Sequence, residues 1–146
     1  MRLLDVNVLL YAFRDAAPDH SRHRAFLESA IDSEEPLGIA ELVLSSFVRI
    51  ATHPRVFDPP ATVDEAFAFT DVLRTLPNAV PIAPGSRHWD LFEQLCREGS
   101  ARGNLVSDAY LAALAIESGC ELITTDRDYA RFPRLRWSHP LGAGSR

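Results

Sequence analysis

The chain has 146 residues, the size of one ordinary domain, and 47% of them are hydrophobic, which is enough for a substantial core. Its formal net charge of −5 argues against a passive nucleic-acid binder with a basic surface, but not against a nuclease that holds cations. No apolar run reaches the roughly 18 residues of a membrane span, and the start lacks the layout of a secretory signal. We therefore expect a cytoplasmic protein without a membrane partner.

The pattern of apolar residues predicts strands and helices that alternate along the chain. The predicted strands cover residues 2–5, 37–40, 79–82, 121–124 and 135–137. The predicted helices cover residues 6–13, 21–31, 41–52, 62–75, 86–98 and 108–118. This alternation favours an α/β fold, in which a parallel sheet is covered by helices on both faces.

Several helix ends carry local signals. Thr62 and Glu65 have the spacing of a capping box, so a helix is expected to begin there. Ser107 is a suitable N-cap for a helix that starts at Asp108, and Gly119 is suited to end that helix. The proline-rich stretch 53–60 is expected to form a loop.

Four acidic residues border apolar segments: Asp5, Glu41, Asp108 and Asp126. Singly, an acid at a helix start or in a turn is common, because the helix dipole and turn geometry favour it. Asp5 is harder to explain in this way, since its surroundings are apolar and a buried carboxylate needs a partner. In parallel sheets, ligands bind outside the carboxyl ends of the strands, so all four acids could converge there.

Convergent carboxylates predict a site for a hard cation. Oxygen ligands suit Mg²⁺ or Mn²⁺, and Mg²⁺ keeps several of its waters, so a few carboxylates suffice. Such a cation can polarise a phosphoryl oxygen and lower the pKa of an attacking water. Both effects assist the hydrolysis of a phosphodiester bond.

Four segments of the chain resemble the PIN-domain family, and within it the VapC-type toxins of bacterial toxin–antitoxin pairs. They read L-L-D-V-N-V-L-L-Y-A, A-E-L-V-L-S-S-F-V-R-I, G-N-L-V-S-D-A-Y-L-A-A-L-A and L-I-T-T-D-R-D-Y-A-R-F. The resemblance implies a three-layer α/β/α domain with a short central parallel sheet over residues 1–140, followed by a flexible tail, 141–146. It also implies a Mg²⁺-dependent endoribonuclease that acts as a toxin, a cognate VapB-like antitoxin that neutralises it, and a homodimer.

The resemblance also implies roles for particular residues. The family's acidic set falls on Asp5, Glu41, Asp108 and Asp126, which would be catalytic, and three of them, Asp5, Asp108 and Asp126, would bind the metal. Asp128 matches a further acid found in some members. Asn7 stands where many members have Thr or Ser, and its amide can still support a carboxylate. Thr124 matches a hydroxyl residue near the fourth acid, or else it is an ordinary strand residue.

Substrate contacts are expected from basic and polar residues near these acids. Arg49 lies eight residues after Glu41, near the same face of the predicted helix, and could bind an RNA phosphate. Arg102, Asn104 and Arg127 are further candidates, although each could equally be a solvated surface residue. The aromatic residues Phe67, Phe69 and Phe92 are interpreted as core or dimer contacts rather than as platforms for bases.

The sequence disfavours two functions other than the nuclease. A phosphatase that uses Asp5 as a covalent nucleophile would want a second acid two residues later and a lysine in the site. The chain has Asn7 at that position and contains no lysine at all. A regulatory module with a vestigial site is disfavoured because all four acids are retained.

Overall fold

The computed structural model describes residues 1–142, so most of the expected tail, residues 143–146, lies outside the described part. The strands are β1 (Arg2–Leu4), β2 (Leu37–Ala40), β3 (Ala79–Ile82), β4 (Glu121–Ile123) and β5 (Trp137–Ser138). The helices are α1 (Val6–Phe13), α2 (His20–Asp32), α3 (Glu41–Ala51), α4 (Val63–Arg74), α5 (His88–Glu98), α6 (Asn104–Ser118) and the short 3₁₀ helix η1 (Arg127–Arg131).

The strands form one parallel sheet in the order β3-β2-β1-β4-β5. The chain first builds the sheet outward from β1 through β2 to β3, and then crosses to the other side of β1 to add β4 and β5. The order therefore reverses at β1, and in such sheets ligands bind at this switch point, beyond the carboxyl ends of the strands. Arg2, Leu3 and Leu4 of β1 pair with Glu121, Leu122 and Ile123 of β4.

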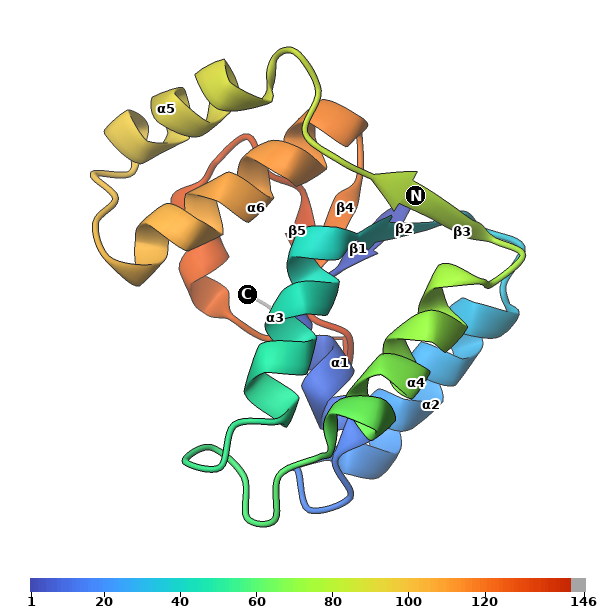
Figure 1. The fold of residues 1–146 in the computed structure, drawn as a ribbon. Coiled ribbons are helices and arrows are strands. Elements are labelled where there is room, and N and C mark those ends of the chain that lie inside the picture. The colour runs from blue at the N-terminus through green and yellow to red at the C-terminus, as the bar shows by residue number, and fades with distance from the viewer. Residues whose placement is uncertain (143–146) are drawn as a thin grey trace.

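Helices cover both faces of this sheet, which confirms the α/β fold expected from the alternation of elements. Figure 1 shows α5 and α6 on the opposite side of the strands from α2 and α4, with α3 in front of the sheet. The central strand β1 and its neighbour β4 are buried on both faces, since the consecutive residues Leu3 and Leu4 of β1, and likewise Leu122 and Ile123 of β4, are all buried. Burying a leucine side chain contributes roughly 1.5–3 kcal/mol, so the central strands anchor the fold.

Helix α6 packs closely because its buried face is rich in alanine. Its buried residues are Ala109, Leu111, Ala112, Ala113, Leu114 and Ala115. Small side chains let a helix backbone approach the sheet, and this brings the residues at the start of α6 close to the carboxyl ends of the strands. None of the helices in residues 1–142 is long and apolar enough to cross a membrane.

Most predicted elements are found within two residues of their expected ends. The Thr62 hydroxyl accepts a hydrogen bond from Glu65 N (3.1 Å), and Gly119 ends α6 in the left-handed region (φ 70°), both as expected. The start of α6 was predicted wrongly. The helix begins at Asn104, because Gly103 adopts a positive φ of 61° and turns the chain there, so Ser107 and Asp108 lie inside the helix.

Candidate active site

Asp5 is held at the junction between β1 and α1. Its backbone N donates to Ile123 O of β4 (2.9 Å), and its side chain caps α1 by accepting from Val6 N (2.7 Å). The other carboxylate oxygen accepts from the Thr124 hydroxyl (2.7 Å) and the Asn7 amide (3.0 Å). The side chain is buried, and burial raises the pKa of Asp5, although these hydrogen bonds oppose the rise.

Thr124 and Asn7 tie this junction to the end of β4. The Thr124 hydroxyl, which has no exposed surface, accepts from the Asn7 amide (3.2 Å) and from Asp126 N (3.1 Å) while it donates to Asp5. The Asn7 carbonyl oxygen accepts from Thr125 N (3.1 Å). Thr124 is thus more than an ordinary strand residue, and the asparagine at position 7 holds the carboxylate of Asp5 with its amide.

Asp126 lies three residues beyond β4, which ends at Ile123 rather than at the acid itself. Its side chain begins η1 by accepting from Asp128 N (2.9 Å). The negative charge of Asp126 contributes to raising the pKa of both Asp5 and Asp108. The third acid is therefore within electrostatic reach of the other two.

Asp108 projects from the second turn of α6. Burial, followed by the charges of Asp126 and Asp5, raises the pKa of Asp108 from 3.8 to about 6. The hydroxyl of Tyr129 donates a long hydrogen bond of 3.4 Å to Asp108. Tyr129 is buried among these acids, which raises the pKa of its own hydroxyl and keeps it a donor.

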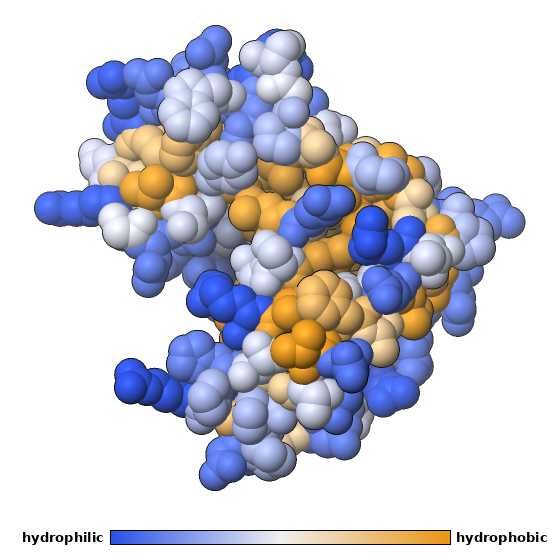
Figure 2. All heavy atoms as spheres, viewed as in Figure 1, coloured by the Kyte–Doolittle hydropathy of each residue, from blue (hydrophilic) through white to orange (hydrophobic). Residues whose placement is uncertain are grey.

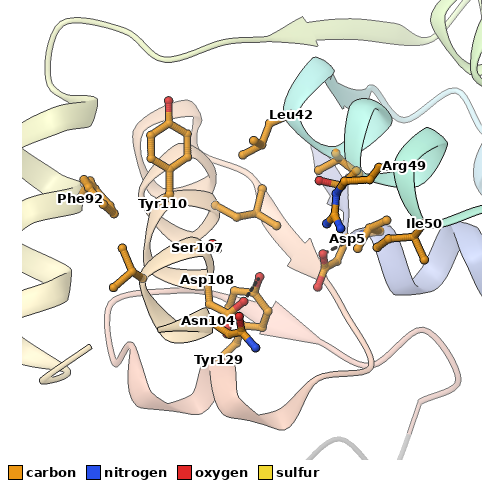
Figure 3. A pocket seen from close by; sticks show the side chains of 15 residues that line it. Asp5, Leu42, Arg49, Ile50, Phe92, Asn104, Ser107, Asp108, Tyr110 and Tyr129 are labelled. Atoms are coloured by element: carbon orange, nitrogen blue, oxygen red, sulfur yellow. Dashed lines mark hydrogen bonds between the residues drawn. The ribbon is translucent and has the colours of Figure 1, made fainter. Parts of the chain in front are cut away.

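Asp5 and Asp108 face one cavity of about 580 Å³, a size typical of ligand sites. Figure 3 shows Asp108, Asn104 and Tyr129 on one side of it and Asp5, Arg49 and Ile50 on the other, with both carboxylates directed into the space between. No ion pair within residues 1–142 involves Asp5, Asp108 or Asp126. Arg49 also lines the cavity, but within residues 1–142 it forms no ion pair with these acids.

Glu41 does not line this cavity, so the four acids do not share one space in this structure, and a catalytic role for Glu41 stays a prediction. It is exposed at the first position of α3 and lines a second, smaller hollow of about 330 Å³ between α3 and α4. The other residues around that hollow are Leu44, Ser45, Val48, Phe67, Thr70, Asp71 and Arg74. Glu41 lies at the expected edge of the sheet, directly after β2, but it and Asp5 line different hollows.

The candidate substrate residues divide into two pairs. Arg49 and Asn104 line the cavity, and Figure 3 shows the Arg49 side chain directed toward Asp5. Arg102 and Arg127 are exposed outside the cavity lining. Arg49 and Glu41 were expected near one helix face, but an eight-residue step rotates by about 80° beyond two full turns, which is enough to separate them.

Several cavity residues were missed by the sequence analysis. Ser46, Tyr110 and Tyr129 line the cavity, and so does Phe92, which was interpreted as a core or dimer contact. Ser46 could have been found, since it stands three residues before Arg49 on the same helix face. Nothing in the local pattern marks Tyr110, because only the packing of α6 against α5 exposes its ring to the cavity.

The donor groups suit a hard divalent cation, although they do not form a complete set of ligands in this arrangement. Mg²⁺ and Mn²⁺ prefer carboxylate oxygens as ligands, and Mg²⁺ needs only a few of them because it keeps several of its waters. Among the described residues, no three His, Cys, Asp or Glu side chains are grouped closely enough to hold a metal. The carboxylates of Asp5, Asp108 and Asp126 therefore have the right chemistry for a divalent cation, and water molecules would supply the rest of its ligands.

Comparisons with known proteins agree with this architecture. The chain matches the PIN domain family over residues 2–135. It is 43% identical over 141 residues to VapC ribonuclease Mb2897 of Mycobacterium bovis, covering 97% of this chain and 96% of that protein. It is 39% identical over 140 residues to ribonuclease VapC25 of Mycobacterium tuberculosis, covering 96% of this chain and 99% of that protein.

A solved structure also shares the fold. The structure of VapBC2 from Rickettsia felis, bound to a DNA fragment from their promoter, contains a chain that superposes with a TM-score of 0.68. The match covers 94% of this chain and 97% of that chain at 18% sequence identity. At that identity, the likeness concerns the arrangement of helices and strands.

Proposed function

The chain belongs to the PIN domain family, and from that premise we propose that it is an endoribonuclease that hydrolyses RNA phosphodiester bonds with Mg²⁺ or Mn²⁺. Two relatives that match nearly its whole length are named ribonucleases. The observation that carries the proposal is the shared cavity of Asp5 and Asp108, with Asp126 close enough for its charge to raise the pKa of both.

The cation would be held by Asp5, Asp108 and Asp126, with Asp128 nearby. When bound, it would stabilise negative charge on a phosphoryl oxygen and lower the pKa of the attacking water. Glu41 stays a prediction: its side chain would have to turn toward the cavity before it could take part.

The remaining residues position these groups and the substrate. Thr124 and Asn7 fix the orientation of Asp5, and the Tyr129 hydroxyl fixes that of Asp108. Arg49, on the opposite wall from Asp108, would bind an RNA phosphate through its guanidinium. In the reaction, a water molecule gives up one proton as its oxygen forms a bond to phosphorus. The bond from phosphorus to a ribose oxygen breaks, and that oxygen takes up one proton, so no proton is gained or lost overall.

We further propose that the protein is the toxin of a toxin–antitoxin pair. The structural neighbour from Rickettsia felis is a VapBC2 structure, which supports a partner protein for this chain as well. An antitoxin segment would neutralise the nuclease by covering the cavity, where a cationic side chain could pair with the free carboxylates. The resemblance to the VapC type also supports a homodimer.

The test is RNA cleavage by the purified protein. We expect RNA to be cut when Mg²⁺ or Mn²⁺ is present, and cleavage to stop with a chelator or with Asp5→Asn. Cleavage that continues without divalent cations would overturn the metal-dependent proposal. Co-expression with the expected cognate antitoxin should give a stable complex that no longer cuts RNA. If no small protein encoded beside this chain inhibits the nuclease, the toxin–antitoxin proposal fails and only the nuclease proposal stands.

A further inference from the structure

The wall of the acidic cavity furthest from Asp5 is aromatic. Phe92 of α5 and Tyr110 of α6 both line it, with their ring centroids 5.3 Å apart at 68°. Both side chains are half-buried, so part of each ring packs against the protein and part remains accessible to solvent. Figure 3 shows Tyr110 standing between α6 and α3, with Phe92 on the α5 side.

Both aromatic rings of this wall contact the buried side chain of His88. His88 is buried, its ring lies 4.3 Å from that of Tyr110 and nearly parallel to that of Phe92, and its Nε2 lies 3.0 Å from Tyr110 O. Trp89 extends the aromatic surface outward, with its ring 5.4 Å from Phe92 and its side chain 65% exposed.

The two ends of the cavity differ in chemistry. One end holds the carboxylates and the guanidinium of Arg49, which suit a cation and a phosphate. The other end offers the rings of Phe92 and Tyr110, which suit a flat apolar group. A nucleotide has this same division between a charged phosphate and a flat base, and unpaired bases stack on aromatic side chains.

We propose that Phe92 and Tyr110 form a base-binding subsite, which takes one unpaired base next to the phosphate that is cut. The inference rests on the proposed ribonuclease function and adds to it how the substrate is positioned. The base packs on the aromatic wall, and this packing sets the adjacent phosphate between Arg49 and the carboxylates. A base inside a duplex cannot reach the wall, so cleavage requires a base that is out of its stack.

The test measures coupling between the base and the wall. The cut position in a mixed-sequence single-stranded RNA is mapped first, and an abasic nucleotide is then placed on either side of that position. For the wild-type protein, removing the base on one side should lower kcat/KM roughly tenfold, because stacking is lost. For Phe92→Leu combined with Tyr110→Leu, the same removal should change kcat/KM by less than about threefold, since the partner surface is already gone.

Phe26→Leu is the matched control, because Phe26 is a half-buried aromatic residue on α2 that does not line the cavity. This variant should keep the full response to the missing base. Equal responses in the wild-type protein and the double variant would overturn the subsite while leaving the nuclease in place. A wild-type protein that cuts no RNA would overturn the proposed function and this inference with it.

A second measurement does not depend on the stability of the double variant. In the inactive Asp108→Asn protein, a single-stranded RNA with 2-aminopurine beside the cut position should lose fluorescence on binding, because stacking on an aromatic ring quenches this base. The same label several nucleotides away should respond less. Binding without any quenching at either neighbouring position would overturn the proposal.

Discussion

Helix α3 separates two hollows that differ in size and in the residues that line them. On one side, residues such as Ser46 and Arg49 face the cavity that contains two carboxylates. On the other, Glu41 and Asp71 line a smaller hollow together with Arg74 and apolar residues such as Val48 and Phe67. Figure 2 shows apolar side chains gathered over the middle of the face that carries α3, with polar residues around its edges. A residue that directly follows a strand, as Glu41 does, therefore need not line the cavity of Asp5 and Asp108. The position of each residue around helix α3 determines which of the two hollows its side chain lines.

The largest expected effect is the loss of an acid from the cavity. Asp5→Asn should lower RNA cleavage by at least about a thousandfold, since it removes a charge that the cation needs. Asp71→Asn, an exposed acid of the second hollow, is the control and should leave cleavage unchanged. Single-turnover cleavage of a labelled RNA measures both. Similar losses in the two variants would remove the distinction between the hollows.

The next effect concerns the link between the two strand ends. Thr124→Val keeps the shape but removes the hydroxyl that bonds Asp5, Asn7 and Asp126 N, so it should cost about 1–3 kcal/mol of stability and lower cleavage about 10- to 100-fold. Chemical unfolding and cleavage assays measure the two losses. Thr70→Val is the control, because that buried hydroxyl bonds only Phe67 O in its own helix. A stability loss as large for Thr70→Val would mean that the network has no special role.

A smaller effect should appear in the stability of the metal-free protein. The pKa of Asp108 is raised from 3.8 to about 6, so the folded state resists its ionisation and loses stability as the pH rises through about 6. Asp108→Asn removes this penalty and should stabilise the protein by about 1 kcal/mol at pH 7.5, after allowance for solvent screening of this partly exposed group. At pH 3.5 and below, where Asp108 is protonated in both the folded and the unfolded state, the gain should vanish.

Thermal melting in a chelator at the two pH values measures this difference. A melting temperature that falls in Asp108→Asn at pH 7.5 would show that the carboxylate stabilises the fold, and that the neighbouring acids do not repel it. Adding Mg²⁺ should reverse the order of the two proteins, because the cation binds only the folded wild-type site well.

The smallest effect is expected from Glu41→Gln. Since Glu41 faces the second hollow, its loss should lower cleavage less than about threefold, within the range of a surface substitution. A loss close to that of Asp5→Asn would show that Glu41 turns into the cavity when metal and RNA bind. The same single-turnover assay, run beside Asp5→Asn, decides between the two positions of the side chain.

Much of the fold could be predicted because its signals are local. The bounds of α1 and β3 were predicted to the residue, since apolar runs and their periods mark them directly. The start of α6 could not be placed as well, because Ser107 has the chemistry of an N-cap while the turn is made by Gly103. Two local signals competed there, and the backbone conformation of the glycine decided between them.

The sequence by itself determined the parallel α/β fold and the presence of acids at the carboxyl edge of the sheet, because the order of elements and the position of each acid beside its strand are local properties. The tertiary structure alone decided which acids share a cavity. It brought Asp5 and Asp108 to one cavity, placed Glu41 in another, and exposed the ring of Tyr110 on the far wall of the first. Those outcomes depend on the rotation of α3 and on how α5 packs against α6, and such rotations are fixed by contacts between elements far apart in the chain.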